Sequence, residues 1–224
     1  MADKMTRMDL EEPDKLQVLF EESLEYVQRN RTRITIIATV VVIVVLLVAG
    51  WFLYSRICEN KALALYQPAF LLEKSGDAKK VATAVKQYKD LLDAYPRSNA
   101  AVLASYRLGN LFFKMNRYDE AIVFYNRYLR RASKSSDLTT LVLSALGASH
   151  EAKKDLKKAL EYYEKAIVTP VDNGFVALNY QNIARIYEEM NDKAKALDYY
   201  EKALAITVDP ATELFIKRKI ALNS

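Results

Sequence analysis

The 224-residue sequence predicts an all-α protein, with a single N-terminal transmembrane helix followed by an α-solenoid of about three and a half to four helical pairs and a C-terminal cap helix. Three observations support this fold class. Only five Gly and five Pro occur, which argues against a sheet protein with many tight turns. One run of 21 residues carries no charge, and a pattern of small and aromatic residues recurs three times after it.

The N-terminal tail, residues 1–33, is acidic and ends in a cluster of arginines. It holds eight acidic and six basic side chains, with Arg29, Arg31 and Arg33 close to the uncharged run. Apolar residues between Leu16 and Val27 recur at helical spacing and predict a short amphipathic helix. Two interpretations stay open. A protein partner binds the apolar face, or the tail is solvated and its arginines contact anionic lipid head groups.

The uncharged run, residues 34–54, predicts a transmembrane helix. At ~1.5 Å per residue, a helix of this length covers the ~30 Å hydrocarbon core of a bilayer. The run is longer than the apolar part of a secretory signal, and Trp51 and Tyr54 fit an interfacial aromatic belt. Arginines are denser before the run than after it. We therefore expect a cytoplasmic N-terminus and place residues 55–224 on the periplasmic side of a bacterial inner membrane.

The part of the chain after the uncharged run contains an internal repeat. In each of three units, a small residue on a first helix is followed 12 residues later by Ala on a second helix, and a Tyr comes four residues after that. Small residues let two helices approach closely, and the aromatic ring fills the space between one pair and the next. The three sets are Gly109, Ala121 and Tyr125, then Gly147, Ala159 and Tyr163, then Ala184, Ala196 and Tyr200.

The pattern extends beyond these units at both ends. Tyr88 and its neighbours repeat the second-helix pattern, and we expect the first helix of this earlier, degenerate pair in Lys61–Lys74. Asp209 and Pro210 suit the N-cap and first position of a helix, so a last helix through Leu222 is expected to close the solenoid. Polar turns are expected within the pairs at 116–120, 153–155 and 191–192, and longer loops between pairs at 133–137 and 169–174.

These residues resemble the tetratricopeptide repeat, a helix–turn–helix unit of ~34 residues with Leu-Gly, an aromatic, Ala, a second aromatic, Ala and Pro. The resemblance implies a tetratricopeptide-like α-solenoid that binds proteins in a concave groove lined by first-helix residues. Cochaperones of this class hold carboxylate ends with a Lys/Asn/Arg clamp, but Tyr106 stands here in place of the Lys and Ala145 in place of the Asn. The predicted groove residues are Tyr106, Asn110, Phe113, Ser144, Ala148, Glu151, Gln181, Arg185 and Glu188.

Three of the groove residues are large enough to act as anchors for a bound polypeptide. Aromatic and Arg side chains dominate the energetics of many protein interfaces, so we expect Tyr106, Phe113 and Arg185 to contribute most of the binding energy. We also expect none of the three to fill the space between helices.

The sequence offers few residues for catalysis. One His and one Cys exclude a tetrahedral zinc site built from these ligands and a disulfide within the chain. His150 falls at an aromatic position of a first helix, where core packing explains it better than acid–base chemistry, and Cys58 is interpreted as incidental. No glycine-rich phosphate loop occurs. We predict no enzyme activity, no metal, no cofactor and no small-molecule substrate.

Residues 55–224 are basic, with 27 Lys and Arg against 20 Asp and Glu. The basic residues recur along helices without a known nucleic-acid-binding motif, so nucleic acid is not an expected partner. A solvated helical face explains the charge best. Attraction to an anionic membrane or to acidic polypeptides is the second interpretation.

The order of acidic tail, span ending in Gly50-Trp51, repeat domain and closing Lys219-Ile220-Ala221-Leu222 resembles the YfgM family, an ancillary subunit of the SecYEG translocon. The resemblance implies a non-enzymatic inner-membrane adaptor. Such an adaptor would contact lipid through residues 34–54, bind SecYEG and periplasmic chaperones such as PpiD, and assist secreted polypeptides. The repeats here follow the general tetratricopeptide pattern more closely than in that family. The alternative is a membrane-anchored scaffold for assembly of another envelope or secretion complex.

Overall fold

A computed structural model of the chain describes residues 15–132, 137–168 and 173–223. The regular structure of these residues is entirely α-helical, and the chain divides into two compact units, residues 1–56 and 57–224. The helices are α1 (Lys15–Arg29), α2 (Arg31–Lys74), α3 (Ala78–Ala94), α4 (Asn99–Lys114), α5 (Tyr118–Leu129), α6 (Asp137–Ala152), α7 (Leu156–Ile167), α8 (Asn173–Glu189), α9 (Lys193–Ile206) and α10 (Pro210–Asn223).

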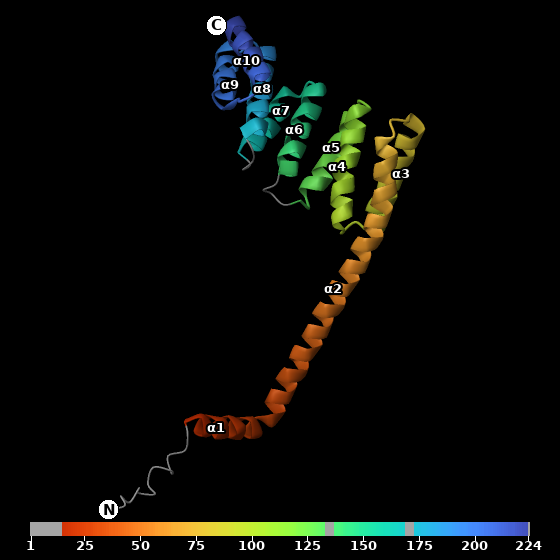
Figure 1. Ribbon diagram of the computed structural model, residues 1–224, viewed down its shortest axis with the longest axis vertical. Coiled ribbons are helices and arrows are strands. Elements are labelled where there is room, and N and C mark those ends of the chain that lie inside the picture. The colour runs from red at the N-terminus through yellow and green to blue at the C-terminus, as the bar shows by residue number, and fades with distance from the viewer. Residues whose placement is uncertain (1–14, 133–136, 169–172, 224) are drawn as a thin grey trace, which may run out of the picture. The chain divides into compact units, whose positions relative to one another are not determined.

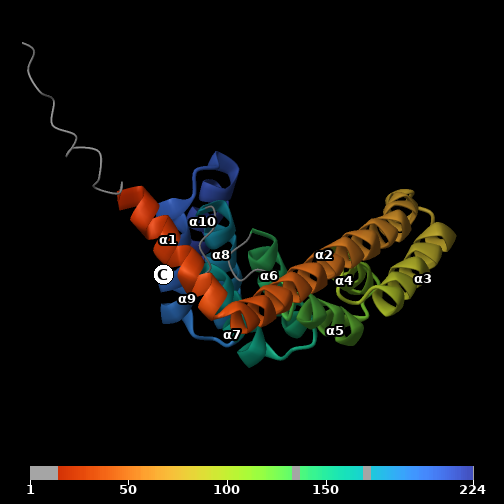
Figure 2. The same ribbon diagram turned by 90° about the horizontal axis from the view of Figure 1, so that it is seen from below.

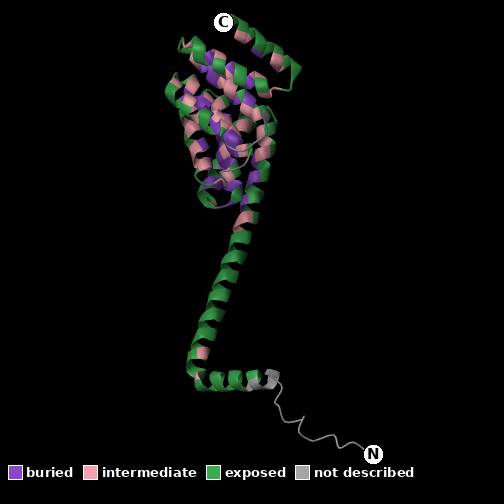
Figure 3. Ribbon diagram, turned by 90° about the vertical axis from the view of Figure 1, so that its left-hand side faces the viewer, coloured by how far each residue is buried: buried purple, intermediate pink, exposed green. Residues whose placement is uncertain are grey.

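The first unit contains α1, which confirms the predicted amphipathic helix, and the N-terminal part of α2. Among the described residues, α2 is the one helix long and apolar enough to cross a membrane. Its most apolar stretch has a mean hydropathy of 3.0 and no buried residue, and this part of α2 is green in Figure 3. The first helix expected in Lys61–Lys74 is confirmed as helical and ends at Lys74, but it has no start of its own, because it is the C-terminal part of α2, with Pro68 inside it.

The second unit is an α-solenoid, which confirms the predicted fold class. Its part of α2 packs on α3 through the rings of Tyr66 and Tyr88, whose centroids are 5.6 Å apart. The pairs α4 with α5, α6 with α7, and α8 with α9 follow, and α10 packs on α9. Figures 1 and 2 show this succession from two directions. The described residues thus form four pairs and a cap helix, which is the upper end of the predicted three and a half to four pairs.

A tight turn joins the helices of each pair and contains one residue in the left-handed conformation. These residues are Gly76, Asn116, Lys154 and Asn191, with φ of 73, 59, 63 and 60°. In three turns the next residue, Asp77, Asp155 or Asp192, caps the following helix by accepting a hydrogen bond from a backbone amide. The turn predicted at 116–120 is too long, because α5 already begins at Tyr118.

The loops between pairs are also shorter than predicted at their C-terminal ends. α6 begins at Asp137 and α8 at Asn173, so the last residues of both predicted loops are helical. The remainder, 133–136 and 169–172, lies outside the described residues, as does the beginning of the acidic tail. The last helix confirms the prediction, because the Asp209 carboxylate accepts a 2.8 Å hydrogen bond from the Thr212 amide at the start of α10.

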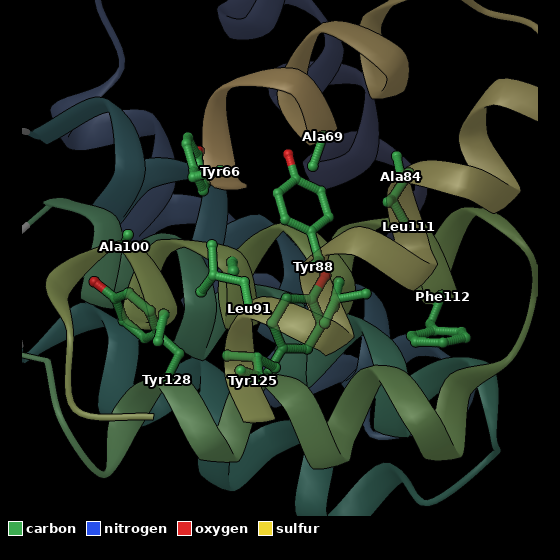
Figure 4. Close-up of a cluster of buried hydrophobic side chains, with 14 of the residues drawn as sticks. Tyr66, Ala69, Ala84, Tyr88, Leu91, Ala100, Leu111, Phe112, Tyr125 and Tyr128 are labelled. Carbon is green, nitrogen blue, oxygen red and sulfur yellow. The ribbon is translucent and has the colours of Figure 1, made fainter. Parts of the chain in front are cut away.

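The core is built around one tyrosine per pair. Tyr88, Tyr125, Tyr163 and Tyr200 are each at most 1% exposed. A Cβ atom added to Gly109 would lie 2.5 Å from the Tyr125 ring, and one added to Gly147 would lie 2.7 Å from the Tyr163 ring. The predicted close approach at these two glycines is therefore confirmed. Figure 4 shows Tyr88 and Tyr125 within the N-terminal cluster.

Glu59, on α2, caps the N-terminus of α4, the first helix of the second pair. Its carboxylate accepts hydrogen bonds from the backbone amides of Asn99, at 2.7 Å, and Ala100, at 3.0 Å. These amides belong to the first turn of α4, where backbone donors lack a partner within the helix. The Ser98 hydroxyl accepts a third amide hydrogen bond, from Ala101, at 3.0 Å. The start of α4 is thus capped from two sides.

His150 belongs to the core, as predicted. Its side chain is 9% exposed, and its ring stacks on Tyr162 with the centroids 5.3 Å apart. Burial lowers the pKa of His150, and the nearby Asp155 carboxylate offsets this effect only in part.

Candidate protein-binding face

The first helices of successive pairs form one layer of the solenoid. α4 contacts α6, and α6 contacts α8, in addition to the contacts of each with its own second helix. All nine predicted groove residues lie on these three helices, and each is half-buried or exposed. We call the surface that they form the inner face.

The inner-face residues of α4 pack back onto α5. The Tyr106 ring lies 6.2 Å from that of Tyr128, and Phe113 meets Tyr118 edge-on at 5.4 Å between centroids. Both Tyr106 and Phe113 also pack against the buried core cluster. The expectation that the aromatic anchors fill no space between helices is therefore wrong for these two residues. Their removal would weaken the fold together with any binding.

Glu151 and Arg185 join α6 to α8. The guanidinium of Arg185 donates two hydrogen bonds to the Glu151 carboxylate, at 3.0 and 2.8 Å, and these bonds raise the Arg185 pKa. The Tyr163 hydroxyl donates a third, at 2.9 Å. Arg185 is thus paired within the chain, although its side chain remains 52% exposed.

Glu188 joins α8 to the cap helix in the same way. Its carboxylate accepts hydrogen bonds from the Tyr200 hydroxyl at 3.0 Å, from Lys219 at 2.8 Å and from Asn223 at 2.6 Å. Partial burial opposes ionisation, but these three donors outweigh it, and the pKa of Glu188 is lowered. The cap helix therefore supplies the cation that a further repeat would supply.

A third carboxylate, which sequence reasoning missed, repeats this arrangement on α2. Glu73 accepts a 2.8 Å hydrogen bond from the Tyr88 hydroxyl and lies 3.6 Å from the Arg107 guanidinium. Arg107 also reaches the Tyr66 hydroxyl at 3.4 Å. We call Glu73, Glu151 and Glu188, with their tyrosines and cations, the carboxylate row.

The second pair interrupts the carboxylate row. Phe113 occupies the position that Glu151 and Glu188 hold in the later pairs, and the Tyr125 hydroxyl donates instead to Asn110, at 2.8 Å. Ala148 stands on α6 where Arg185 stands on α8. We call Tyr106, Asn110, Phe113 and Ala148 the neutral window, because these four residues carry no charge between two charged pairs.

One sequence signal could have revealed the carboxylate row. The second helix of every pair carries Tyr, never Phe, at its central core position. A buried phenol needs a hydrogen-bond partner, so four tyrosines predict four acceptors on the facing helices. Spacings of 12 or 15 residues back from the tyrosines lead to Glu73, Asn110, Glu151 and Glu188.

The remaining two inner-face residues, Ser144 and Gln181, have different surroundings. Ser144 lies 2.8 Å from the side chain of the buried Asn179, which links α6 to α8. Gln181 helps line a depression of about 410 Å³. The other residues that line it come from α8, the end of α9, the segment that joins α9 to α10 and the start of α10, among them Ala177, Leu178, Val208 and Thr212.

The inner face differs from a carboxylate clamp. Such a clamp holds a ligand carboxylate with cations that have no acidic partner in the free protein. Here Arg107, Arg185 and Lys219 each face a carboxylate of the chain itself. With Tyr106 in place of the clamp Lys, the geometry agrees with the sequence that recognition of a carboxylate end is disfavoured.

Helical pairs that stack in one direction, with first helices in one layer, define an α-solenoid repeat protein. Residues 99–168 and residues 180–214 each match the tetratricopeptide repeat. The two matches and the stacked helical pairs support a tetratricopeptide repeat protein, and such repeats indicate a protein–protein interaction scaffold. Both matches are to a repeat, and neither is to a catalytic family.

Solved structures support the same fold. A structure of MamA from Desulfovibrio magneticus RS-1 is 21% identical over 66% of this chain and 76% of that one, with a TM-score of 0.55. A second MamA structure is 21% identical over 65% of this chain and 77% of the other, with a TM-score of 0.54. At this identity the likeness extends to the fold alone. The search of curated proteins returned no match.

Proposed function

We propose that this chain is a single-pass membrane protein that holds protein partners on the inner face of its solenoid. The supporting observation is the presence, in one chain, of an exposed apolar helix and a set of tetratricopeptide repeats. Exposed apolar surface costs ~25 cal/mol per Å² in water, a cost that a bilayer removes. The proposal places residues 1–33 in the cytoplasm, residues 34–54 in the membrane and residues 55–224 in the periplasm.

The inner face favours a particular class of partner. Its charged residues Glu151, Arg185 and Glu188 are already paired within the chain. A ligand with a terminal carboxylate or a strongly charged segment would have to break these pairs, whereas the neutral window requires no such exchange. We propose that the partner is an uncharged polypeptide segment that places apolar side chains against Tyr106 and Phe113.

The resemblance to the YfgM family suggests which partners to test first. By that resemblance the chain is a non-enzymatic adaptor between the SecYEG translocon and a PpiD-like chaperone. The alternative is a scaffold for another envelope complex, with the same membrane anchor and the same inner face.

Copurification of the full chain in mild detergent tests the proposal. Translocon subunits in the eluate support the adaptor, and subunits of another envelope machine support the alternative. Ala148→Arg places a charge in the neutral window and is expected to lower partner recovery several-fold. Val123→Arg, at a 59% exposed position of α5, is the matched control and should leave recovery unchanged.

Thermal unfolding of both variants separates lost binding from lost folding. If Ala148→Arg melts as the wild type does and still recovers every partner, the inner face is not the binding surface. That result would not test the proposal that α2 is a membrane anchor.

A further inference from the structure

α1 has two chemically different faces. At about 100° per residue, its described apolar side chains fall within an arc of about 160°. Glu22, Glu25, Gln28 and Arg29 lie on the rest of the circumference, and the small polar Ser23 lies within the apolar arc. The apolar side chains are Leu19, Phe20, Leu24, Tyr26 and Val27, and they are 44–67% exposed.

The position of α1 in the chain points to the surface that covers this face. Only Asn30 separates α1 from α2, and its amide donates a 3.0 Å hydrogen bond to the Tyr26 carbonyl. The uncharged part of α2 begins at Ile34, about one helical turn further on, or roughly 5 Å. If α2 crosses a membrane, α1 ends within about a turn of the lipid interface.

We propose that α1 is an interfacial helix that lies along the membrane surface. Its apolar face contacts the acyl chains, and Glu22 and Glu25 face the water. The inference rests on the proposed membrane anchoring of α2. A helix with separate apolar and charged faces is the type that binds in the plane of a bilayer interface.

The charge of α1 defines the kind of lipid surface. Interfacial helices that depend on anionic lipid carry Lys and Arg on their polar face, whereas α1 presents Glu22 and Glu25 there, with Arg29 at its end. Its membrane contact is therefore apolar in origin. We expect it to persist on purely zwitterionic lipid and at high salt, where an electrostatic attachment is screened.

Spin labels on the full chain, reconstituted in phosphatidylcholine vesicles, test this inference. In a Cys58→Ser background, single labels are placed through Phe20→Cys, Leu24→Cys and Val27→Cys on one face and Glu22→Cys and Glu25→Cys on the other. Collision with oxygen, which concentrates in lipid, should exceed collision with a water-soluble nickel complex at the first three positions. The order should reverse at the two acidic positions, with several-fold differences.

Three outcomes would overturn the inference. Equal access of the nickel complex to all five positions would show that α1 is solvated. Protection of the apolar face that disappears when the protein is diluted in lipid would assign the face to a second copy of the chain. A dependence of the pattern on added phosphatidylglycerol would show that charge holds α1 at the surface.

A label at Val44→Cys, within α2, separates this inference from the proposed function. If that label is protected from the nickel complex while α1 is accessible, the anchor stands and only the interfacial helix is wrong. If the label at position 44 is itself accessible, the membrane anchor and the interfacial helix are both wrong.

Discussion

Arg185 on α8 and Glu151 on α6 lie 34 residues apart and meet through two hydrogen bonds, of 3.0 and 2.8 Å. This separation is close to the length of one repeat. Other side-chain contacts along the solenoid have nearly the same separation, including Ser144 with Asn179 and Asn223 of the cap helix with Glu188, both at 35 residues. The repeat therefore sets polar contacts as well as the core.

The first prediction measures this relationship. In a double-mutant cycle on residues 57–224, Arg185→Ala and Glu151→Ala should show a coupling free energy of ~1 kcal/mol, because the ion pair is bidentate but half-exposed. Chemical unfolding provides the measurement. Lys202 and Asp198, a pair of exposed side chains within α9, form the control cycle, for which we expect a coupling free energy of about 0.2–0.5 kcal/mol. Equal coupling free energies in the two cycles would show that the Arg185–Glu151 contact stabilises the solenoid no more than an ordinary exposed ion pair does.

The second prediction concerns the cap that Glu59 provides for α4. Glu59→Ala removes the acceptor from two backbone amides and should lower the free energy of unfolding of residues 57–224 by ~0.5–2 kcal/mol. Lys61→Ala, at an exposed position on the same helix, is the control and should change it little. A loss of the same size from both substitutions would mean that the cap contributes nothing of its own.

The third prediction tests the close approach at Gly109. Gly109→Ala puts a Cβ atom 2.5 Å from the Tyr125 ring, so the ring must shift, and we expect ~1–3 kcal/mol of destabilisation. The full chain in detergent is followed by circular dichroism on heating. Gly50→Ala meets nothing within 4 Å and should leave the melting curve of the solenoid unchanged. Identical curves for the two variants would refute the packing at Gly109.

The fourth prediction concerns pH and the only histidine of the chain. The folded state lowers the pKa of His150 below its unfolded value. Its stabilising contribution is therefore complete above the unfolded pKa of ~6.5 and declines as pH falls below it. His150→Phe removes the titrating group, so the difference in unfolding free energy between neutral and mildly acidic pH should shrink. An unchanged difference would show that other groups cause the pH dependence.

The repeat register could be predicted from the sequence because its determinants are local and periodic. Gly109 and Gly147 stand at fixed distances from the tyrosines that they contact, and Asp209 with Pro210 marks a helix start within two residues. The contact between Glu59 and the Asn99 amide joins residues 40 positions apart, and no local sequence pattern predicts it. Periodicity also predicts that Arg185 is exposed on α8, but it does not tell whether the charge of Arg185 is already paired.

The continuity of α2 could not be read from composition. Its residues change from an uncharged run to a charged segment near Arg56, which is typical of a boundary between a span and a linker. The backbone hydrogen bonds of a helix form equally well on both sides of that change, because straight-chain charged residues are good helix formers. Pro68 also favours a break, yet the helix continues past it to Lys74.

The pairing of each solenoid helix with its neighbours in sequence has a consequence for biosynthesis. Contacts that join segments close in sequence can form as soon as both segments have emerged into the compartment where the domain folds. α4 and α5 can thus pack before α8 exists, and each new pair finds a finished surface to stack on. α10 is the last of the described helices to emerge, and before Lys219 and Asn223 arrive, the Tyr200 hydroxyl is the side-chain donor from the described residues that reaches the Glu188 carboxylate. The open end of the growing solenoid therefore stays hydrophilic at that carboxylate, which favours addition of the next helix over aggregation.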